Sequence, residues 1–337
     1  MIIETFCYPR AAVIGNPSDG YFGKTIAFLF SNFKAKVQLY QTPELDIQPQ
    51  RLDKTRFNSI KELVENVNHS GYYGGIRLLK ATIKVFYDYC KKSNISLDER
   101  NFTIRYNSNI PLRLGLAGSS AIITACMKAL TKFYGITIPK PVMANLVLSV
   151  EDKELGIAAG LQDRVAQAYG QPVYMDFNKK LMEKQGYGNY EVIDASLFPD
   201  MYIAFRKNLS EGTEVLHNNL RARFNIGEKA VLEAMKKWSG YTEGFMTALK
   251  NNDFNTLHEL INANFDLRAS LINITQGNME MVRAARSVGA SAKFTGSGGA
   301  IIGTYPNEDT YKKMVKILAE KNIEVIKPNI VNISKDD

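Results

Sequence analysis

The chain has 337 residues, of which 45% are hydrophobic and 23% charged, and these proportions exclude a disordered or fibrous protein. Its net charge of +8 comes from Lys and Arg residues dispersed along the chain, so we expect no nucleic-acid partner. The three cysteines and three histidines are widely separated, which argues against a disulfide framework, a zinc site and a Ser-His-Asp triad.

The length and the apolar runs of the chain predict its organisation and location. All apolar runs are shorter than the roughly 20 residues of a membrane-spanning helix, so we expect no membrane partner. The N-terminal segment lacks the features of a secretory signal, which predicts a cytoplasmic protein. The length favours two domains, and the polar segment MEKQGYGN predicts a boundary near residue 188, giving domains at 1–188 and 189–337.

The hydrophobic pattern of the first half predicts a mixed α+β domain rather than a regular strand–helix alternation. The predicted strands are 11–15, 24–30, 34–48, 101–108 and 172–177. The predicted helices are 58–68, 78–92, an apolar helix after the glycine-rich loop near 118, 142–154 and 161–170.

The second half follows a different pattern. The predicted strands are 190–194, 201–206, a pair joined by a glycine loop within 292–306, and 323–331. The predicted helices are 226–238, 241–251, 253–271, 279–289 and 311–322. Between 201 and 331 the order β-α-β-β-α-β, with extra helices inserted, predicts a ferredoxin-like α+β sandwich.

The segment GLAGSSAIITA (115–125) combines two glycines and two hydroxyls with the start of a small, apolar helix. Unpaired N–H groups and the partial positive charge of a helix N-terminus suit a phosphate group. The same residues would also serve as a serine cap after a flexible loop. A phosphate site and a simple helix cap are therefore both open readings of this segment.

Two further features have the same double interpretation. The loop TGSGGA (295–300) allows close backbone approach to a ligand, or forms only a wide hairpin turn. Glu151 and Asp163 could hold Mg²⁺ and accept a proton from a hydroxyl. Alternatively, Asp163 caps a helix and Glu151 faces solvent.

The segment SDGYFGKT (18–25) nearly matches the nucleotide-binding pattern G-x-x-x-x-G-K-[ST]. Ser18 replaces the first glycine of that pattern. The following residues, TIAFLF, are β-branched and aromatic, which predicts a strand where the motif needs a helix. We therefore do not interpret this segment as a nucleotide-binding loop.

Three segments resemble, in order, the motifs of the GHMP small-molecule kinases. They are PRAAVIGNPSDGYFG (9–23), PLRLGLAGSSAI (111–122) and KFTGSGGAIIG (293–303). The resemblance implies a two-domain α+β fold, with an N-terminal domain like ribosomal protein S5 domain 2 and a ferredoxin-like C-terminal domain. It also implies that ATP and Mg²⁺ are the cofactors. The nucleotide phosphates are expected at Gly115, Leu116, Ala117, Gly118, Ser119, Ser120 and Ala121.

Longer segments resemble one branch of this family, the plant-type glucuronokinases. They include GYYGGIRLLKA (71–81), LVLSVEDKELGIAAGLQDRVAQAYG (146–170) and ARSVGASAKFTGSGGA (285–300). This resemblance implies ATP-dependent phosphorylation of D-glucuronate at its anomeric hydroxyl. The alternatives are a kinase for another hexose or uronate, such as galacturonate or a heptose phosphate, and a non-catalytic sugar sensor. The oligomeric state is left open.

The resemblance also implies catalytic roles. In the family pattern a metal-binding Glu precedes the catalytic Asp by twelve residues, as Glu151 precedes Asp163 here. Asp163 would accept the proton of the reacting hydroxyl, and Arg10 matches the family Arg that keeps this Asp ionised. One additional residue separates Gly-Leu from Ser-Ser, so either Ser120 or Ser119 matches the metal-binding serine.

The substrate residues come partly from the resemblance and partly from chemistry. Asp19 matches the family's sugar-contacting Asp, and Gly298 lies in the third motif. A uronate carries a carboxylate, which a fixed arginine would bind through two parallel hydrogen bonds. The candidates are Arg77, Arg164 and Arg268, each of which could instead form an ion pair within the protein.

Overall fold

The computed structural model describes residues 2–50, 53, 56–70, 74–206 and 215–332. The chain forms two compact units that are interleaved in sequence. The first unit comprises Met1–Pro9, Phe33–Leu112 and Ala117–Ala168, and the second comprises Arg10–Asn32, Arg113–Leu116 and Tyr169–Asp337. The domain boundary near residue 188 stays a prediction.

The first unit is built on a four-stranded sheet of order β1-β4-β6-β5. Its strands are β1 (Ile2–Cys7), β4 (Ala35–Thr42), β5 (Asp46–Gln48) and β6 (Asn101–Ser108), and only the β5–β6 pairing is parallel. Its helices are α1 (Ile60–Ser70), α2 (Ile76–Lys92), α3 (Gly118–Tyr134), α4 (Lys140–Ser149), a π-helical turn η3 (Val150–Glu154) and α5 (Leu161–Tyr169).

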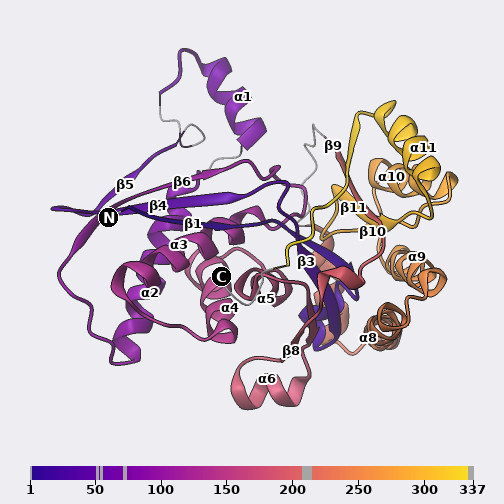
Figure 1. The fold of residues 1–337 in the computed structure, drawn as a ribbon, viewed down its shortest axis with the longest axis horizontal. Coiled ribbons are helices and arrows are strands. Elements are labelled where there is room, and N and C mark those ends of the chain that lie inside the picture. Colours follow the sequence, from indigo (N-terminus) through magenta and orange to yellow (C-terminus); the bar gives the residue numbers. More distant parts are fainter. Residues whose placement is uncertain (1, 51–52, 54–55, 71–73, 207–214, 333–337) are drawn as a thin grey trace. The chain divides into compact units, whose positions relative to one another are not determined.

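Helix α3 packs against β1 and β4 (Figure 1) because both surfaces are apolar and closely fitting. Strand β4 alternates, burying Ala35, Val37 and Leu39 while its other residues are more exposed. On α3, small buried residues such as Ala125 allow the helix to approach the sheet. The hydroxyl of Thr5 on β1 donates to the Ala125 carbonyl oxygen at 2.7 Å, which ties the two elements together.

The second unit contains two antiparallel sheets, each of four strands. One has the order β2-β3-β7-β8, with strands β2 (Arg10–Ile14), β3 (Lys24–Leu29), β7 (Val173–Asp176) and β8 (Asn189–Val192). The other has the order β10-β11-β9-β12, with strands β9 (Met201–Arg206), β10 (Lys293–Phe294), β11 (Ala300–Thr304) and β12 (Ile323–Ile326). In chain order this second sheet reads 2-3-1-4, which confirms the predicted ferredoxin-like topology.

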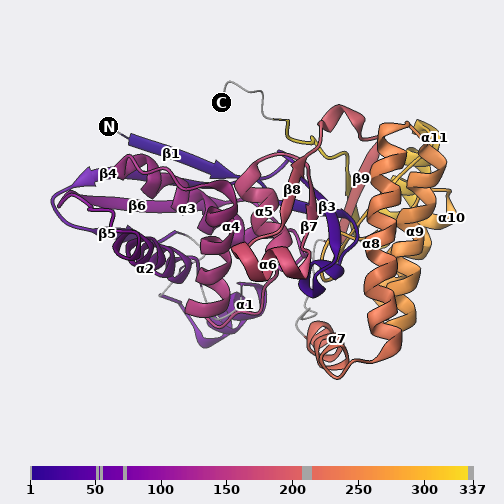
Figure 2. The same ribbon diagram turned by 90° about the horizontal axis from the view of Figure 1, so that it is seen from below.

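The helices of the second unit include two short 3-10 turns and six α-helices among the described residues. They are η1 (Ser18–Tyr21), α6 (Lys179–Gln185), η4 (Ala195–Leu197), α7 (Val215–Asn225), α8 (Lys229–Lys250), α9 (Phe254–Leu271), α10 (Gln276–Ser287) and α11 (Glu308–Ala319). Helices α8 and α9 lie side by side (Figure 2). The buried Trp238 of α8 donates through Nε1 to the Asn264 carbonyl oxygen on α9 at 3.1 Å.

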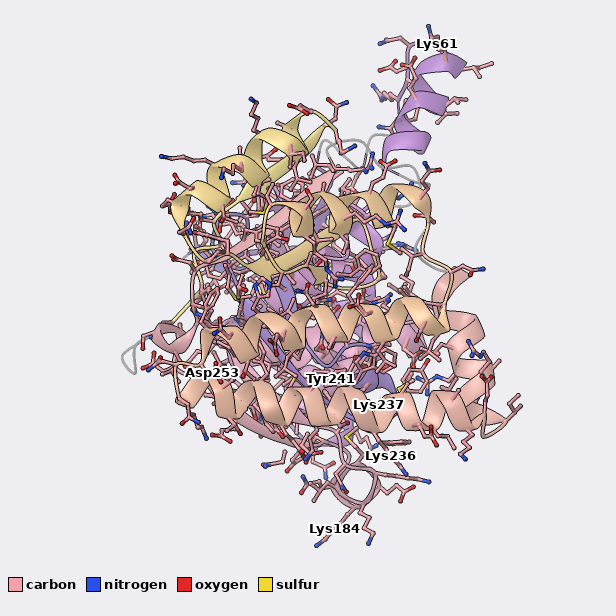
Figure 3. All side chains as sticks on the ribbon, turned by 90° about the vertical axis from the view of Figure 1, so that its right-hand side faces the viewer. Lys61, Lys184, Lys236, Lys237, Tyr241 and Asp253 are labelled. Atoms are coloured by element: carbon pink, nitrogen blue, oxygen red, sulfur yellow. The ribbon has the colours of Figure 1, made fainter. Side chains whose placement is uncertain are left out.

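The outer side of α8 and α9 is polar. Lys236 and Lys237 lie exposed on α8, and Asp253 stands at the start of α9 (Figure 3). The Asp253 carboxylate accepts from the Thr256 backbone N–H at 3.1 Å and from its hydroxyl at 2.6 Å. Asp253 is therefore the N-cap of α9, and this capping lowers the pKa of its carboxyl group.

The sequence prediction divided or missed several elements of the structure. The two helices predicted at 226–238 and 241–251 form one helix, α8, which continues through the exposed Gly240. Buried Trp238 and Phe245 on either side outweigh the roughly 1 kcal/mol that an interior glycine costs a helix. Strand β1 and helices α6 and α7 were not predicted.

None of the helices formed by the described residues has the length and apolar character needed to cross a lipid bilayer.

Candidate active site

The predicted phosphate-binding helix exists and begins where expected. Helix α3 starts at Gly118, after Ala117 in the left-handed conformation with φ 61°. Ala117 presents its carbonyl oxygen to the buried Gln167 of α5, whose Nε2 donates to it at 3.0 Å. This contact fixes the turn from which the first N–H groups of α3 emerge, and sequence analysis did not identify Gln167.

The two serines of this turn have different surroundings. Ser119 is exposed, and its hydroxyl donates to Glu151 Oε1 at 2.6 Å. Ser120 is fully buried, and its hydroxyl donates to the Ala117 carbonyl oxygen at 3.1 Å. Of these two serines, Ser119 is therefore the one that has an accessible hydroxyl beside a carboxylate.

Glu151 is buried in the π-helical turn η3, where the chain leaves α4. Burial of a carboxylate requires compensating partners, and Arg164 on α5 supplies them. The Arg164 Nε donates to Glu151 Oε2 at 3.0 Å, and its Nη2 donates to the same oxygen. Glu151 thus has one oxygen held by a guanidinium and the other directed to Ser119, so the alternative reading in which it faces solvent is wrong.

Arg164 also contacts the second predicted carboxylate. Its Nη1 donates to Asp163 Oδ2 at 3.1 Å and to the Gly160 carbonyl oxygen at 2.9 Å. Asp163 lies in the first turn of α5 and is half-buried. The structure therefore brings Ser119, Glu151 and Asp163 together around one buried guanidinium in the first unit.

Arg77 is the remaining arginine candidate in the first unit. It is the second residue of α2 and is half-buried. Its role as a ligand of a substrate carboxylate stays a prediction.

In the second unit, the glycine loop between β10 and β11 meets Gly115. A Cβ atom built on Gly296 would lie 2.6 Å from the Gly115 carbonyl oxygen, closer than any side chain tolerates. A Cβ on Gly115, which has φ +64°, would lie 3.1 Å from the Gly298 carbonyl oxygen. Glycines at these positions therefore allow two backbone segments far apart in sequence to touch.

Arg10 of β2 belongs to the same cluster. Its backbone N–H donates to the Leu116 carbonyl oxygen at 3.0 Å, and its Nη1 donates to the Thr295 carbonyl oxygen. Arg10 is buried beside the glycine loop of the second unit. That Arg10 keeps Asp163 ionised stays a prediction.

Arg268 of α9 also supports the glycine loop. Its Nη1 donates to the Gly296 carbonyl oxygen at 2.9 Å, and its Nη2 donates to the Ser297 carbonyl oxygen at 3.1 Å. The guanidinium lies over the ring of Phe294, 5.1 Å from the ring centroid. Burial lowers the pKa of Arg268 to about 10, with Asp19 acting in the opposite direction.

Lys293 is a buried cation that sequence analysis did not single out. Its Nζ donates to the Ala12 carbonyl oxygen at 2.8 Å and to the Phe294 carbonyl oxygen at 2.7 Å. Burial lowers its pKa well below the ordinary value, and the neighbouring Arg268 and Arg10 lower it further. Its position next to a glycine motif was the only sequence signal that could have identified it.

Asp19 lies on the 3-10 turn η1 between β2 and β3 and is half-buried. The same turn carries the buried Tyr21, whose ring contacts Phe224 of α7 at 4.8 Å between centroids. The Arg221 guanidinium carbon lies 4.3 Å from the centroid of the Tyr21 ring. Arg221, on a helix that was not predicted from the sequence, therefore lies against the turn that carries Asp19.

Comparison with known proteins identifies the family of this chain. Residues 77–171 match the GHMP kinase N-terminal domain, and residues 245–324 match the GHMP kinase C-terminal domain. The chain is 42% identical over 334 residues to Probable glucuronokinase 2 of Arabidopsis thaliana, covering 97% of this chain and 91% of that protein. It is 43% identical over 320 residues to Glucuronokinase 1 of the same plant, covering 93% of this chain and 88% of that protein. The chain belongs to the GHMP kinase family.

This GHMP kinase also has the fold of its family. The crystal structure of Methanococcus jannaschii mevalonate kinase superimposes with a TM-score of 0.71 at 22% identity, covering 98% of both chains. The predicted family and fold class are thus confirmed. Membership in a kinase family makes the protein a phosphotransferase whose phosphoryl donor is ATP.

Proposed function

We propose that this GHMP kinase transfers the γ-phosphoryl group of ATP to the anomeric hydroxyl of D-glucuronate, forming glucuronate 1-phosphate and ADP. The observation that carries the proposal is the 42% identity to Probable glucuronokinase 2 of Arabidopsis thaliana over 97% of this chain. The contacts among the predicted site residues give a physical basis for each step.

The N-terminus of α3 is suited to the nucleotide phosphates. Helix α3 has 17 residues, and its first turn presents backbone N–H groups that have no partner within the helix. These groups and the helix dipole favour a bound anion. The residues Gly115 to Ala121 supply this turn and the segment that leads into it.

Ser119 and Glu151 fit a Mg²⁺ ion that accompanies ATP. Mg²⁺ prefers oxygen ligands, and proteins often supply one or two of them while phosphates and water supply the rest. The Ser119 hydroxyl and Glu151 Oε1 are neighbouring oxygens, and Ser119 is exposed. We therefore assign the metal-binding serine to Ser119 rather than Ser120. Bound Mg²⁺ would neutralise phosphate charge that develops during transfer.

Asp163 is the proposed proton acceptor. As the anomeric oxygen forms a bond to the γ-phosphorus, the bond from that phosphorus to the β-γ bridging oxygen breaks and the hydroxyl proton passes to the Asp163 carboxylate. The Arg164 contact at 3.1 Å holds the carboxylate in place. Arg164 therefore acts as a positioning residue for Asp163 and Glu151, and not as the ligand of a substrate carboxylate.

The proposal is tested by measuring ADP release from purified protein with ATP, Mg²⁺ and D-glucuronate. We expect ADP release that depends on the sugar, and a product that has lost its reducing end because C1 carries the phosphate. Carbon–phosphorus coupling at C1 in the NMR spectrum identifies that position. A product that remains reducing contradicts anomeric phosphorylation, and sugar binding without ADP release indicates a sensor.

A further inference from the structure

The carboxylate of a uronate needs a cation that is not already committed within the protein. The Arg164 guanidinium donates hydrogen bonds to Glu151, Asp163 and the Gly160 carbonyl oxygen. Arg268 directs both terminal nitrogens to backbone carbonyl oxygens of the glycine loop. Two of the three arginines expected from the sequence are therefore engaged in holding the protein's own structure.

Arg221 on α7 is differently placed. The helix is anchored by Leu220 and Phe224, which pack with Tyr21 and Trp238 in one apolar cluster. The Arg221 guanidinium carbon lies 4.3 Å from the centroid of the Tyr21 ring, a distance at which the ring face attracts a cation. Arg221 itself is exposed. Its head group is thus fixed against a buried ring while solvent can still reach it.

The backbone of η1 accommodates this position of Arg221. A Cβ atom built on Gly20 would lie only 3.1 Å from Arg221 Nη2. The guanidinium therefore lies close against a glycine that directly follows Asp19. Glycine at position 20 leaves space for Nη2 beside the residue that matches the family's sugar-contacting Asp.

The local charge favours an anionic ligand. Within the described part of the chain, no carboxylate forms an ion pair with Arg221. By contrast, Arg223 on the same helix pairs with Glu228 at 2.6 Å. Tyr21 lies within electrostatic range of two arginines, Arg221 and Arg268, and of the single carboxylate of Asp19. Among the described charged groups that act on Tyr21, two are therefore cationic and one is anionic.

We propose that Arg221 is the residue that recognises the sugar carboxylate and so determines the preference for a uronate over a neutral hexose. This inference rests on the proposed function and names the specificity residue of that activity. The contact with Tyr21 positions the guanidinium, and an exposed guanidinium can donate two parallel hydrogen bonds to a carboxylate.

The test compares Arg221→Gln with the wild-type enzyme on D-glucuronate and D-glucose. We expect the ratio of kcat/KM for glucuronate to that for glucose to fall by about 10- to 100-fold, mainly through a higher KM for glucuronate. Activity on glucose should change little, because glucose has no carboxylate. Arg221→Lys, which keeps the charge but loses the planar fork, should give an intermediate ratio.

Arg283→Gln is the matched control, because Arg283 is an exposed arginine on α10 in the same unit and its loss changes the net charge equally. It should leave the ratio at the wild-type value. An unchanged ratio in Arg221→Gln overturns the assignment of Arg221 while leaving the proposed function intact. A wild-type enzyme without activity on glucuronate overturns both. Should Arg221→Gln not fold, the ratio of Arg221→Lys decides, and a wild-type ratio there contradicts the bidentate contact.

Discussion

The Ser119 hydroxyl lies 2.6 Å from Glu151 Oε1, whereas the neighbouring Ser120 hydroxyl is buried against the Ala117 carbonyl oxygen. Of the two adjacent serines, it is therefore Ser119 whose hydroxyl contacts the Glu151 carboxylate. Sequence spacing left both serines open, because the loop has one residue more than the family pattern.

Substitution of each serine separates their roles. We expect Ser119→Ala to raise the Mg²⁺ concentration needed for half-maximal activity on the order of 10-fold, as does Glu151→Gln, because each removes an oxygen beside the metal. Ser120→Ala should change the Mg²⁺ requirement little. Magnesium titrations of initial rate check this prediction, and a larger effect at Ser120 than at Ser119 would reverse the assignment.

Asp163→Asn should abolish turnover while ATP affinity stays within a few fold of the wild type. Asparagine keeps the size of the side chain but cannot accept the proton, and loss of a general base typically reduces the rate by about 10²- to 10⁴-fold. Single-turnover kinetics and nucleotide binding measured on the same sample check both parts. A variant that retains more than about a tenth of wild-type activity would show that Asp163 is not the base.

Arg164→Gln should destabilise the protein, because it leaves the buried Glu151 carboxylate without its cation. Removing one partner of a buried ion pair typically lowers the free energy of unfolding by about 3–5 kcal/mol. The double variant Glu151→Gln with Arg164→Gln should be more stable than Arg164→Gln alone, since no unpaired charge remains. Urea unfolding of the two variants and the wild type measures the difference, and equal stabilities of the single and double variants would contradict this prediction.

The buried Lys293 predicts how the free energy of unfolding changes with pH. Its pKa in the folded protein is well below the ordinary value of 10.5, so between these two values the unfolded chain binds more protons than the folded one. The free energy of unfolding should therefore rise with pH through this window. Lys293→Met lacks the group, so the stability of the wild type relative to this variant should increase from about pH 7 to about pH 10. A relative stability that falls over this range would contradict the shift.

Much of the fold could be predicted because its determinants are local. The alternation in NFTIRYNS gave the strand that became β6, and the order of strands and helices after residue 201 gave the ferredoxin-like sheet. Gly240 misled the prediction because tertiary packing of its neighbours outweighs its low helix propensity. Helix α7 has a weak apolar pattern of its own, and among its described side chains Leu220 and Phe224 belong to the apolar cluster.

The candidate site could be predicted in its residue types but not in its contacts. The twelve-residue spacing of Glu151 and Asp163 identified both acids. The role of Arg164 could not be read from spacing, because its guanidinium reaches Glu151 across an irregular segment that separates η3 from α5. Similarly, the position of Arg221 over Tyr21 joins residues 200 apart, which no local pattern can show.

The ratio of kcat/KM for D-glucuronate to that for D-glucose in the wild-type enzyme is the most direct test of the proposed function. Hydrogen bonds to charged groups contribute about 1.5–3 kcal/mol each, and a carboxylate can accept two of them from one guanidinium, whereas the neutral sugar cannot. We expect the ratio to be about 10² or more. Equal efficiency on the two sugars would contradict the assignment to uronate and leave a general sugar kinase.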